Sequence, residues 1–526
     1  MKEISIDYRR LKALALILLV LPNLVFFVGW IKLLYSVPLS ILLIGAVIFA
    51  LRKDEDKRQL KISIPELIMI AVLVIAWCIL TGIGGFTASK NDLFWRNPIY
   101  GDLIYKHWPV KYKGDMKGLS LSYYIGYWMV PGAFAKLFRG LGKDTAWTVG
   151  RYALVGWTSV LLFTSALLLK MYTGAKGFLR TLFIMLLFIF FSDMDIVQKW
   201  VQKILDNPGE LNSGAADRHY ELMTYCWQYS SMTTQLGWVF NQAVPAWLAT
   251  LLFLNEKSAR CYALIGLSIM LTSPLPLIGL CVYMLAFAAR DIFRSAKAKK
   301  IKEAFKNIVT LPNILALFSI FPPVGLYLSS NKASGSTIFA LNFVSIHWRS
   351  YLALFIGGHI IAAIILIGKK RLFECILLIC SFLVFPVVFI GNAAYDVLND
   401  PNSKPEMSDF CMRVSIPAVV ILLCLIGKYL LENYSFTKDV RSRLLTIFLV
   451  LSLMAPYTEF KACIEGTLHP EEKAYFYPYD KSLTSLEEMD PVKIFNFDEN
   501  GKPIKEESNF VCVTKKSTFH KYLARK

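Results

Sequence analysis

Three polar segments of the sequence combine acidic, basic and aromatic residues in spacings that could do chemistry. In the first, Asp92 precedes Arg96 by four residues, which places both side chains on one face of a helix. The carboxylate could act as a general base while the guanidinium offsets the charge of a phosphate. The same pair also fits an amphipathic surface helix that Asp92 caps, with Trp95 and Trp108 in the headgroup layer.

The second segment is dense in amides, hydroxyls and aromatic rings, a composition that suits a sugar or a lipid headgroup. Aromatic rings cover the apolar faces of a sugar, while amides bond to its hydroxyls. An ordinary aromatic belt at a membrane surface predicts the same rings, and His219 alone could be a surface histidine. The candidate binding residues are Asp193, Asp195, His219, Gln228, Tyr229, Asn241 and Gln242.

The third segment places Arg413 at the start of an apolar run. An arginine there costs a few kcal/mol unless it is paired or snorkels to the interface. A snorkelling anchor is one interpretation. The other is a clamp for an anionic lipid phosphate, which the planar guanidinium fits with two parallel hydrogen bonds.

Long apolar runs must position these three segments. Of the 526 residues, 56% are hydrophobic and 18% are charged, which is outside the range of soluble globular chains. Runs such as 11–30, 64–83, 352–367 and 372–390 approach the roughly 20 residues that cross a bilayer as a helix. We predict an all-α polytopic membrane protein with about 13 transmembrane helices, roughly 11–14, and short interfacial helices.

The net charge of +19 could suggest nucleic acid, but the basic residues cluster in short loops between apolar runs. This is the positive-inside pattern, which places those loops in the cytoplasm and argues against nucleic-acid binding. The run 11–30 is expected to stay as the first half of a helical hairpin, because no cleavage site follows it. The sequence also has no Cys-x-x-Cys metal spacing and no glycine-rich nucleotide motif.

Counting crossings from the basic loops gives a domain organisation. Residues 1–63 form an N-terminal hairpin and cytoplasmic loop, and residues 64–290 form a transmembrane module. Residues 291–457 hold the C-terminal helices, and residues 458–526 form a small extracytoplasmic tail with strands around a turn at 499–503.

Two loops of the transmembrane module are expected outside the cytoplasm. The first is 84–120, and the second is the polar loop 192–237. The second loop lies outside if one of the three apolar runs before it fails to cross. It lies inside if the run 262–287, which Ser273-Pro274 interrupts, is one broken crossing. We expect it outside.

The order of these features resembles the C-type (GT-C) membrane glycosyltransferases, and more narrowly uncharacterised bacterial multipass proteins of that kind. The resemblance covers most of the chain through short motifs. These are Asn91-Asp92 through Trp108-Pro109, Leu121-Ser122-Tyr123-Tyr124, Phe191-Ser192-Asp193-Met194-Asp195, Gln228-Tyr229-Ser230-Ser231, Asn241-Gln242, Asp409-Phe410 to Pro417, and Phe519-His520-Lys521-Tyr522-Leu523.

The resemblance implies an enzyme that moves a sugar from a polyprenyl-phosphate carrier to a glycan, lipid or protein acceptor outside the cytoplasm. The catalytic base would be Asp92, with Asp102 as the second acidic candidate, and Arg96, His107 and Arg413 would help to bind the substrate. No cofactor is required by the sequence, although Mg or Mn could take part. The expected location is the inner (cytoplasmic) membrane.

Two other functional classes share this architecture. A polymerase or ligase of lipid-linked glycans is the nearest, and a transporter or flippase for lipid-linked or anionic solutes is the second. Transporters place charges near the bilayer midplane and have two matching halves. Here the midplane runs are almost free of charge and the halves do not match, which favours chemistry at a surface loop. A non-catalytic assembly partner is a further alternative.

Overall fold

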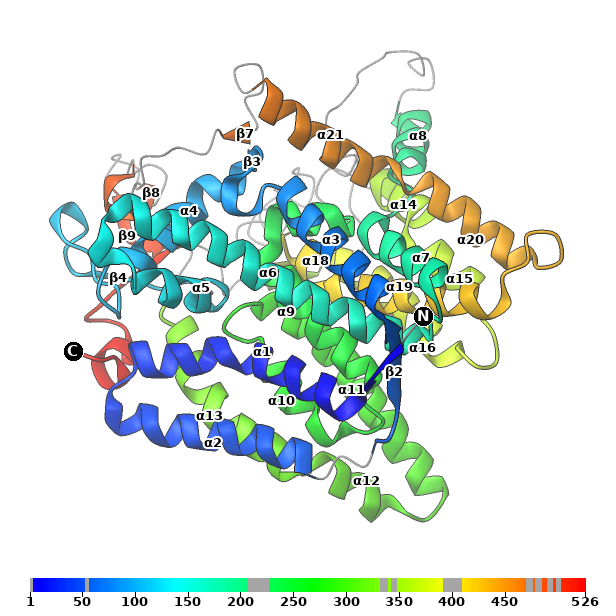
Figure 1. The fold of residues 1–526 in the computed structure, drawn as a ribbon, viewed down its shortest axis with the longest axis horizontal. Helices are drawn as coiled ribbons and strands as arrows, with labels where there is room; N and C mark the ends of the chain where they lie inside the picture. The colour runs from blue at the N-terminus through cyan, green and yellow to red at the C-terminus, as the bar shows by residue number, and fades with distance from the viewer. Residues whose placement is uncertain are drawn as a thin grey trace.

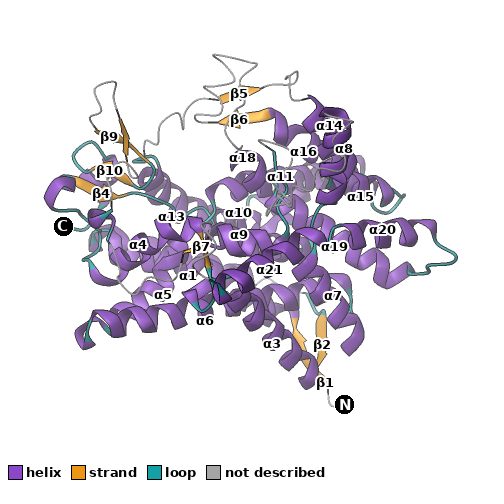
Figure 2. Ribbon diagram, turned by 90° about the horizontal axis from the view of Figure 1, so that it is seen from above, coloured by secondary structure: helices purple, strands orange, loops and turns teal. Residues whose placement is uncertain are grey.

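The computed structural model describes the chain except for residues 1–2, 53–55, 207–226, 332–338, 342–347, 391–408, 470–475, 478–484, 490–494 and 498–502. The described residues form a body of helices, and their strands pair only in two-stranded sheets. Most of these small sheets lie at the periphery of the helical body (Figure 2). No closed sheet is present in the described residues, so the backbone polar groups of the apolar runs are satisfied within helices.

Eight helices in the described residues are long and apolar enough to cross a membrane, and a bent pair raises the number to nine. The chain is therefore an all-α multi-pass membrane protein. The eight are α1 (Tyr8–Trp30), α2 (Leu33–Arg52), α6 (Lys143–Thr173), α9 (Met232–Asn255), α11 (Pro274–Lys297), Ile301–Leu328 (α12 with α13), α19 (Ile416–Asn433) and Val440–Leu468 (α20 with α21), and the bent pair is α7 (Phe178–Phe190) with α8 (Asp195–Asp206).

The larger count of about 13 crossings stays a prediction, because several apolar runs form shorter or broken helices. The run 64–83 gives α3 (Ile64–Leu80), and the run 372–390 gives α16 (Leu372–Val384), a 3-10 turn and a short strand. The run 352–367 breaks at Gly357-Gly358 into α14 (Trp348–Gly357) and α15 (His359–Ile365). A Cβ atom at Gly357 would lie 2.4 Å from Cγ of Gln198, so the break lets α8 approach closely.

The remaining helices are short, and they include the separate segments of the two combined spans. The helices are α4 (Asn91–Tyr105), α5 (Gly126–Lys136), α10 (Tyr262–Ser268), α12 (Ile301–Ile308), α13 (Leu311–Leu328), α18 (Asp409–Val414), α20 (Val440–Leu451) and α21 (Met454–Leu468). The strands are β1 (Glu3–Asp7), β2 (Gln59–Ser63), β3 (Ser89–Lys90), β4 (Leu119–Leu121), β5 (Phe339–Leu341), β6 (Val388–Ile390), β7 (Phe476–Tyr477), β8 (Phe495–Phe497), β9 (Pro503–Ser508) and β10 (Val511–Val513).

The helix ends gather on two opposite faces of the body. At one face, which we call the basic face, α1 meets α9 through Lys12 and Glu256 (2.7 Å), and α6 meets α3 through Lys170 and Glu66 (2.7 Å). At the other, the distal face, the start of α6 meets α4 through a hydrogen bond from Tyr105 to the carbonyl oxygen of Lys143 (2.7 Å). The helices α1, α2, α6 and α13 run side by side between the two faces (Figure 1).

The first polar loop and the described ends of the second, residues 192–206 and 227–237, lie on the same, distal face. Helix α5 does not return to the basic face, because the ammonium group of Lys136 near its end donates to the carbonyl oxygens of Leu103 and Lys106 in α4. Helix α6 therefore starts at the distal face, α7 returns to it, and α9 starts there. The run 262–287 does not form one continuous helix, since α10 and α11 meet at Ser273, whose hydroxyl donates to the carbonyl oxygen of Gln242 (2.7 Å).

The C-terminal residues pack onto the distal face as a mixture of helix and strand. Helix α21 carries Glu459 to within 2.6 Å of Lys90 on β3. Strands β8 and β9 pair antiparallel on either side of the predicted turn, and β7 and β10 pair with β3 and β4 of the first loop. The expected strands are present, although the turn itself lies outside the described residues. The helical extension to Leu468 was not expected from the sequence.

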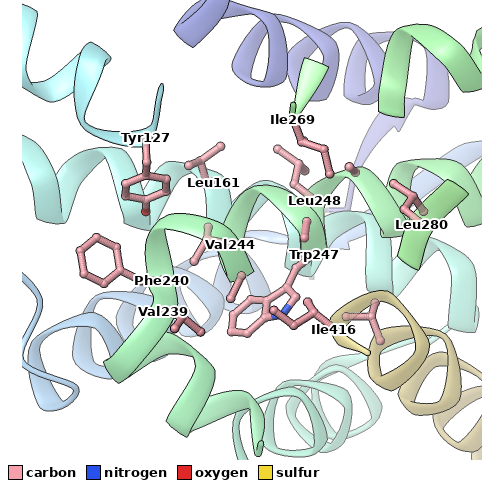
Figure 3. Packing of buried hydrophobic residues seen from close by; sticks show 14 of the residues in the cluster. Tyr127, Leu161, Val239, Phe240, Val244, Trp247, Leu248, Ile269, Leu280 and Ile416 are labelled. Carbon is pink, nitrogen blue, oxygen red and sulfur yellow. The ribbon is translucent and has the colours of Figure 1, made fainter. Parts of the chain in front are cut away.

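Helix α9 forms the centre of the apolar core. Figure 3 shows Phe240, Val244, Trp247 and Leu248 on α9 among side chains from neighbouring helices. The indole of Trp247 stacks on Trp77 of α3 at 5.7 Å between ring centroids. Its N–H donates to the side-chain oxygen of Gln235 (2.9 Å), which satisfies the one polar atom of a fully buried ring.

A buried ionic cluster joins α3, α6 and α7. Glu66 lies in the first turn of α3, where it completes a capping box with Ser63. Its carboxylate also accepts hydrogen bonds from Lys170 (2.7 Å) and from Thr181 (2.6 Å). Both charged side chains are at most 3% exposed, so each compensates the charge of the other.

Replacing Lys170 by methionine is expected to lower the free energy of unfolding by about 3–5 kcal/mol, because it leaves the Glu66 carboxylate buried without its cation. Thermal unfolding in detergent would measure the loss. Lys176→Met, in the exposed loop before α7, is the matched control and should change little. Adding Glu66→Gln to the Lys170→Met variant should recover part of the stability. A Lys170→Met protein as stable as the wild type would contradict the ionic role.

Candidate functional site

The predicted pair of Asp92 and Arg96 forms at the start of α4. Lys90 is the N-cap residue of α4, so Asp92 lies in its first turn, where the helix dipole favours a negative charge. A carboxylate oxygen of Asp92 lies 2.6 Å from a guanidinium nitrogen of Arg96. The Asp92 side chain is 36% exposed and the Arg96 side chain only 5%, so the carboxylate is the accessible member of the pair.

Arg96 is held from the other side by α9, because its guanidinium also donates to the backbone carbonyl oxygen of Trp238. Burial lowers the pKa of Arg96, but the nearby carboxylate of Asp92 and the phenol groups of Tyr123 and Tyr124 raise it, and the pKa ends above its ordinary value. Arg96 therefore stays a cation in this buried position.

Arg413 reaches the same place from the distant α18. Its guanidinium donates to the hydroxyl of Tyr124 (2.9 Å), and its side chain is buried. Tyr124 accepts a further hydrogen bond from Tyr123, and the two ring centroids lie 3.7 Å apart. Arg96 and Arg413 are close enough to act on each other and on Tyr123 electrostatically. We call Asp92, Arg96, Tyr123, Tyr124 and Arg413 the arginine cluster.

A second ionic pair closes the side of the arginine cluster that faces α21. Lys90 and Glu459 are almost fully buried, with 2.6 Å between the ammonium nitrogen and a carboxylate oxygen. The indole N–H of Trp238 points to the same Glu459 oxygen at 3.3 Å, and the Lys90 ammonium lies 5.8 Å from the Trp238 ring centroid. Trp238 therefore contacts Lys90 and Glu459 through its ring and Arg96 through its backbone carbonyl oxygen.

The two carboxylates of the second acidic motif, Asp193 and Asp195, are buried, and Asp193 contacts a histidine. Asp193 contacts Nδ1 of His359 through one carboxylate oxygen and accepts a hydrogen bond from Gln198 (3.0 Å) through the other. Asp195 accepts one from Ser192 (3.0 Å). The His359 ring lies among aromatic rings of Phe191, Tyr229, Phe382 and Phe448.

His359 was missed in the sequence analysis. It follows the Gly357-Gly358 break in an otherwise apolar run, and an ionisable residue inside such a run is a signal that could have marked it. Its partner Asp193 lies far away in the sequence, so the pair itself had no local signature.

The other described candidates of the second segment are buried as well. Tyr229 donates to the carbonyl oxygen of Phe382 (2.6 Å), and Gln228 donates to Ser230 (2.5 Å). Asn241 and Gln242 lie about one helical turn after Trp238 on α9 and are at most 1% exposed. Helix α9 is bent at Val239 just before them.

Asp102 holds α4 against the C-terminal tail. It accepts hydrogen bonds from Tyr112 (3.1 Å), from Ser485 (2.6 Å) and from the backbone N–H of Leu486 (3.3 Å), and these bonds join α4 to the C-terminal tail. Burial raises the pKa of Asp102 to about 6, although the Ser485 hydrogen bond and the charge of Lys106 oppose the shift.

Of the two predicted histidines, the structure describes one. His107 is exposed just after α4. His219 lies outside the described residues. The described residues also contain no group of three or more His, Cys, Asp or Glu side chains that could hold a metal ion, so the structure gives the possible Mg or Mn no binding site there.

Comparisons of the chain with known protein families, with curated proteins and with solved structures found no match. A function must therefore be argued from the geometry of the site.

The contact between α4 and the tail is expected to weaken as the pH rises. The folded-state pKa of Asp102 lies above its ordinary value of 3.8, so the folded chain binds more protons than the unfolded chain between 3.8 and about 6. The contribution of Asp102 to stability is therefore highest below pH 3.8 and falls as the pH rises to about 6. Hydrogen exchange of residues 485–488, corrected for intrinsic rates, should be slower at pH 5 than at pH 7.

Asp102→Asn should remove this pH dependence, because the amide does not titrate, while Asp115→Asn at an exposed position of the same loop should keep it. Equal protection of residues 485–488 at both pH values in the wild type would contradict the assignment.

Proposed function

We propose that this protein is a membrane glycosyltransferase that moves a sugar from a polyprenyl-phosphate carrier to an acceptor hydroxyl at the distal face. The observation that carries the proposal is the convergence of Arg96 and Arg413 at Tyr123 and Tyr124, beside the accessible carboxylate of Asp92. Two convergent guanidinium groups suit a substrate with a negative charge, such as a lipid phosphate.

The proposed reaction needs little apparatus beyond this cluster. Asp92 accepts the proton of the acceptor hydroxyl as its oxygen attacks the anomeric carbon of the sugar. The bond from that carbon to the carrier phosphate oxygen breaks, and the phosphate leaves with the bonding electron pair. Arg96 and Arg413 stabilise the negative charge of the leaving phosphate, so positioning and electrostatics supply the rate.

The location of the proposed chemistry follows from the charge distribution. The basic loops mark the cytoplasmic side by the positive-inside rule, so the distal face would be extracytoplasmic. The membrane would be the inner membrane of a bacterial cell. The acceptor would be a glycan, a lipid or a protein, and a polymerase or ligase of lipid-linked glycans would use the same cluster.

A transporter of anionic solutes is the second candidate, and the buried contact of Asp193 with His359 favours it. An ionisable pair among apolar helices is a common feature of proton-coupled transport. Proton-dependent uptake of a lipid-linked or anionic solute into vesicles, lost in His359→Phe, would support this class over a transferase.

Asp92→Asn is expected to lower the transfer rate at least about 100-fold, because the amide cannot accept the proton. The assay is sugar transfer from a polyprenyl-phosphate donor by protein reconstituted in vesicles. Asp115→Asn removes an acid of the same loop and serves as the matched control. Membrane insertion should be unchanged in both. Near wild-type activity of Asp92→Asn, or labelling of residue 92 from the cytoplasmic side, would contradict the proposal.

Arg413→Lys is expected to weaken binding of the donor about tenfold or more, since an ammonium group cannot form two parallel hydrogen bonds to a phosphate. The same substitution should have less effect on the KM for the acceptor. Arg349→Lys, at the exposed start of α14, is the control. An equal change of KM for donor and acceptor would indicate that Arg413 acts on the fold of the site rather than on the phosphate.

A further inference from the structure

A cavity of about 470 Å³ lies on the basic face, opposite the distal face that holds the arginine cluster. Helices α1 and α2, the end of α9 and the junction of α12 with α13 all contribute to its wall. No residue of the proposed transfer site lines it. The cavity is therefore a separate feature whose ligand must be argued from its own residues.

The two carboxylates in the wall are both neutralised by neighbouring cations. Glu256 accepts hydrogen bonds from Lys12 (2.7 Å) and from the hydroxyl of Tyr8 (2.6 Å). Asp56 pairs with Arg58 (2.8 Å) and with Lys257 (3.2 Å). These contacts fix the back of the cavity and leave no negative charge uncompensated there.

Two further cations face the same space. Arg260 comes from the turn Ala259–Cys261, and Lys306 comes from α12. Within the described ranges of the chain, no carboxylate forms an ion pair with either side chain. The first residues of α13 also line the cavity, so the positive end of an 18-residue helix adds to the field. The cavity therefore attracts an anion.

The remaining wall is apolar and adjoins an amphipathic helix. Phe49, Val309 and Leu311 form this side. Ile301 and Phe305 on α12 and Val309 just after it follow one another at intervals of four residues, and each is at least 43% exposed. Such a stripe is typical of an amphipathic helix that lies in the interface with its apolar side in lipid. Lys306 is then at headgroup level.

We propose that this cavity binds the headgroup phosphate of an anionic phospholipid from the leaflet at the basic face. Arg260 and Lys306 hold the phosphate, and the apolar wall at Phe49 and Leu311 lies against the start of the acyl chains. A soluble phosphate would satisfy the two cations but would leave this wall without a partner. The combination of excess positive charge and an adjoining apolar wall is what favours a lipid.

Native mass spectrometry of the full chain tests the proposal with phosphatidylglycerol and phosphatidylcholine of identical acyl chains. The wild type should retain phosphatidylglycerol preferentially. Arg260→Gln with Lys306→Gln should weaken phosphatidylglycerol binding about tenfold or more and leave phosphatidylcholine binding unchanged. Lys302→Gln removes the same charge from the same helix outside the cavity wall, and it should keep the preference.

Two results would overturn the proposal. One is an equal loss of preference in Lys302→Gln, which would indicate attraction to the whole basic face. The other is displacement of the lipid by millimolar inorganic phosphate or glycerol phosphate, which would indicate a site for soluble anions.

If the double variant does not fold, Arg260→Gln and Lys306→Gln are measured separately by the increase of thermal stability on adding phosphatidylglycerol. An increase equal to that of the wild type in both single variants would also overturn the proposal.

Discussion

The constraint on which this structure depends is the cost of an uncompensated charge in a low-dielectric helical interior. The three buried lysines of the described residues meet carboxylates from other parts of the chain. Lys12 meets Glu256, Lys90 meets Glu459, and Lys170 meets Glu66. Each pair joins elements that are distant in sequence. The requirement for charge compensation thereby helps to decide which helices are neighbours.

The functional proposals concern places where two cations converge. At the distal face, Arg96 and Arg413 converge at Tyr123 and Tyr124, and the Asp92 carboxylate lies beside Arg96. At the basic face, Arg260 and Lys306 line a cavity whose two carboxylates already have partners. Excess positive charge beside an apolar surface has one natural complement, an amphiphile with an anionic headgroup. The same physical argument therefore leads to a lipid phosphate at both faces.

Breaks in the apolar helices allow polar groups to meet inside this body. The glycines between α14 and α15 bring His359 to Asp193, since side chains at those positions would collide with α8 and with the preceding turn. At the Ser273-Pro274 break the chain turns back to the basic face. There the hydroxyl of Ser273 donates to the carbonyl oxygen of Gln242 in α9, just beyond the bend at Val239. Several of the apolar runs thus form short or broken helices.

Properties that depend on local sequence could be predicted. Apolar run length and charge placement indicated a multi-pass helical membrane protein, and the four-residue spacing of Asp92 and Arg96 led to their ion pair. The alternating tail led to the antiparallel pair of β8 and β9. In each case the interacting residues are close in the chain, or the property depends only on composition, so no knowledge of distant neighbours is needed.

Contacts between distant segments were decided by the tertiary structure. The approach of Arg413 to Tyr124, the contact of His359 with Asp193, and the burial of Asp102 under the tail all join residues whose separation along the chain carries no geometric information. Packing also decides whether an apolar run forms one long helix or two short ones, as in the run 352–367. Sequence could therefore indicate candidate residues, and only packing decides which of them meet.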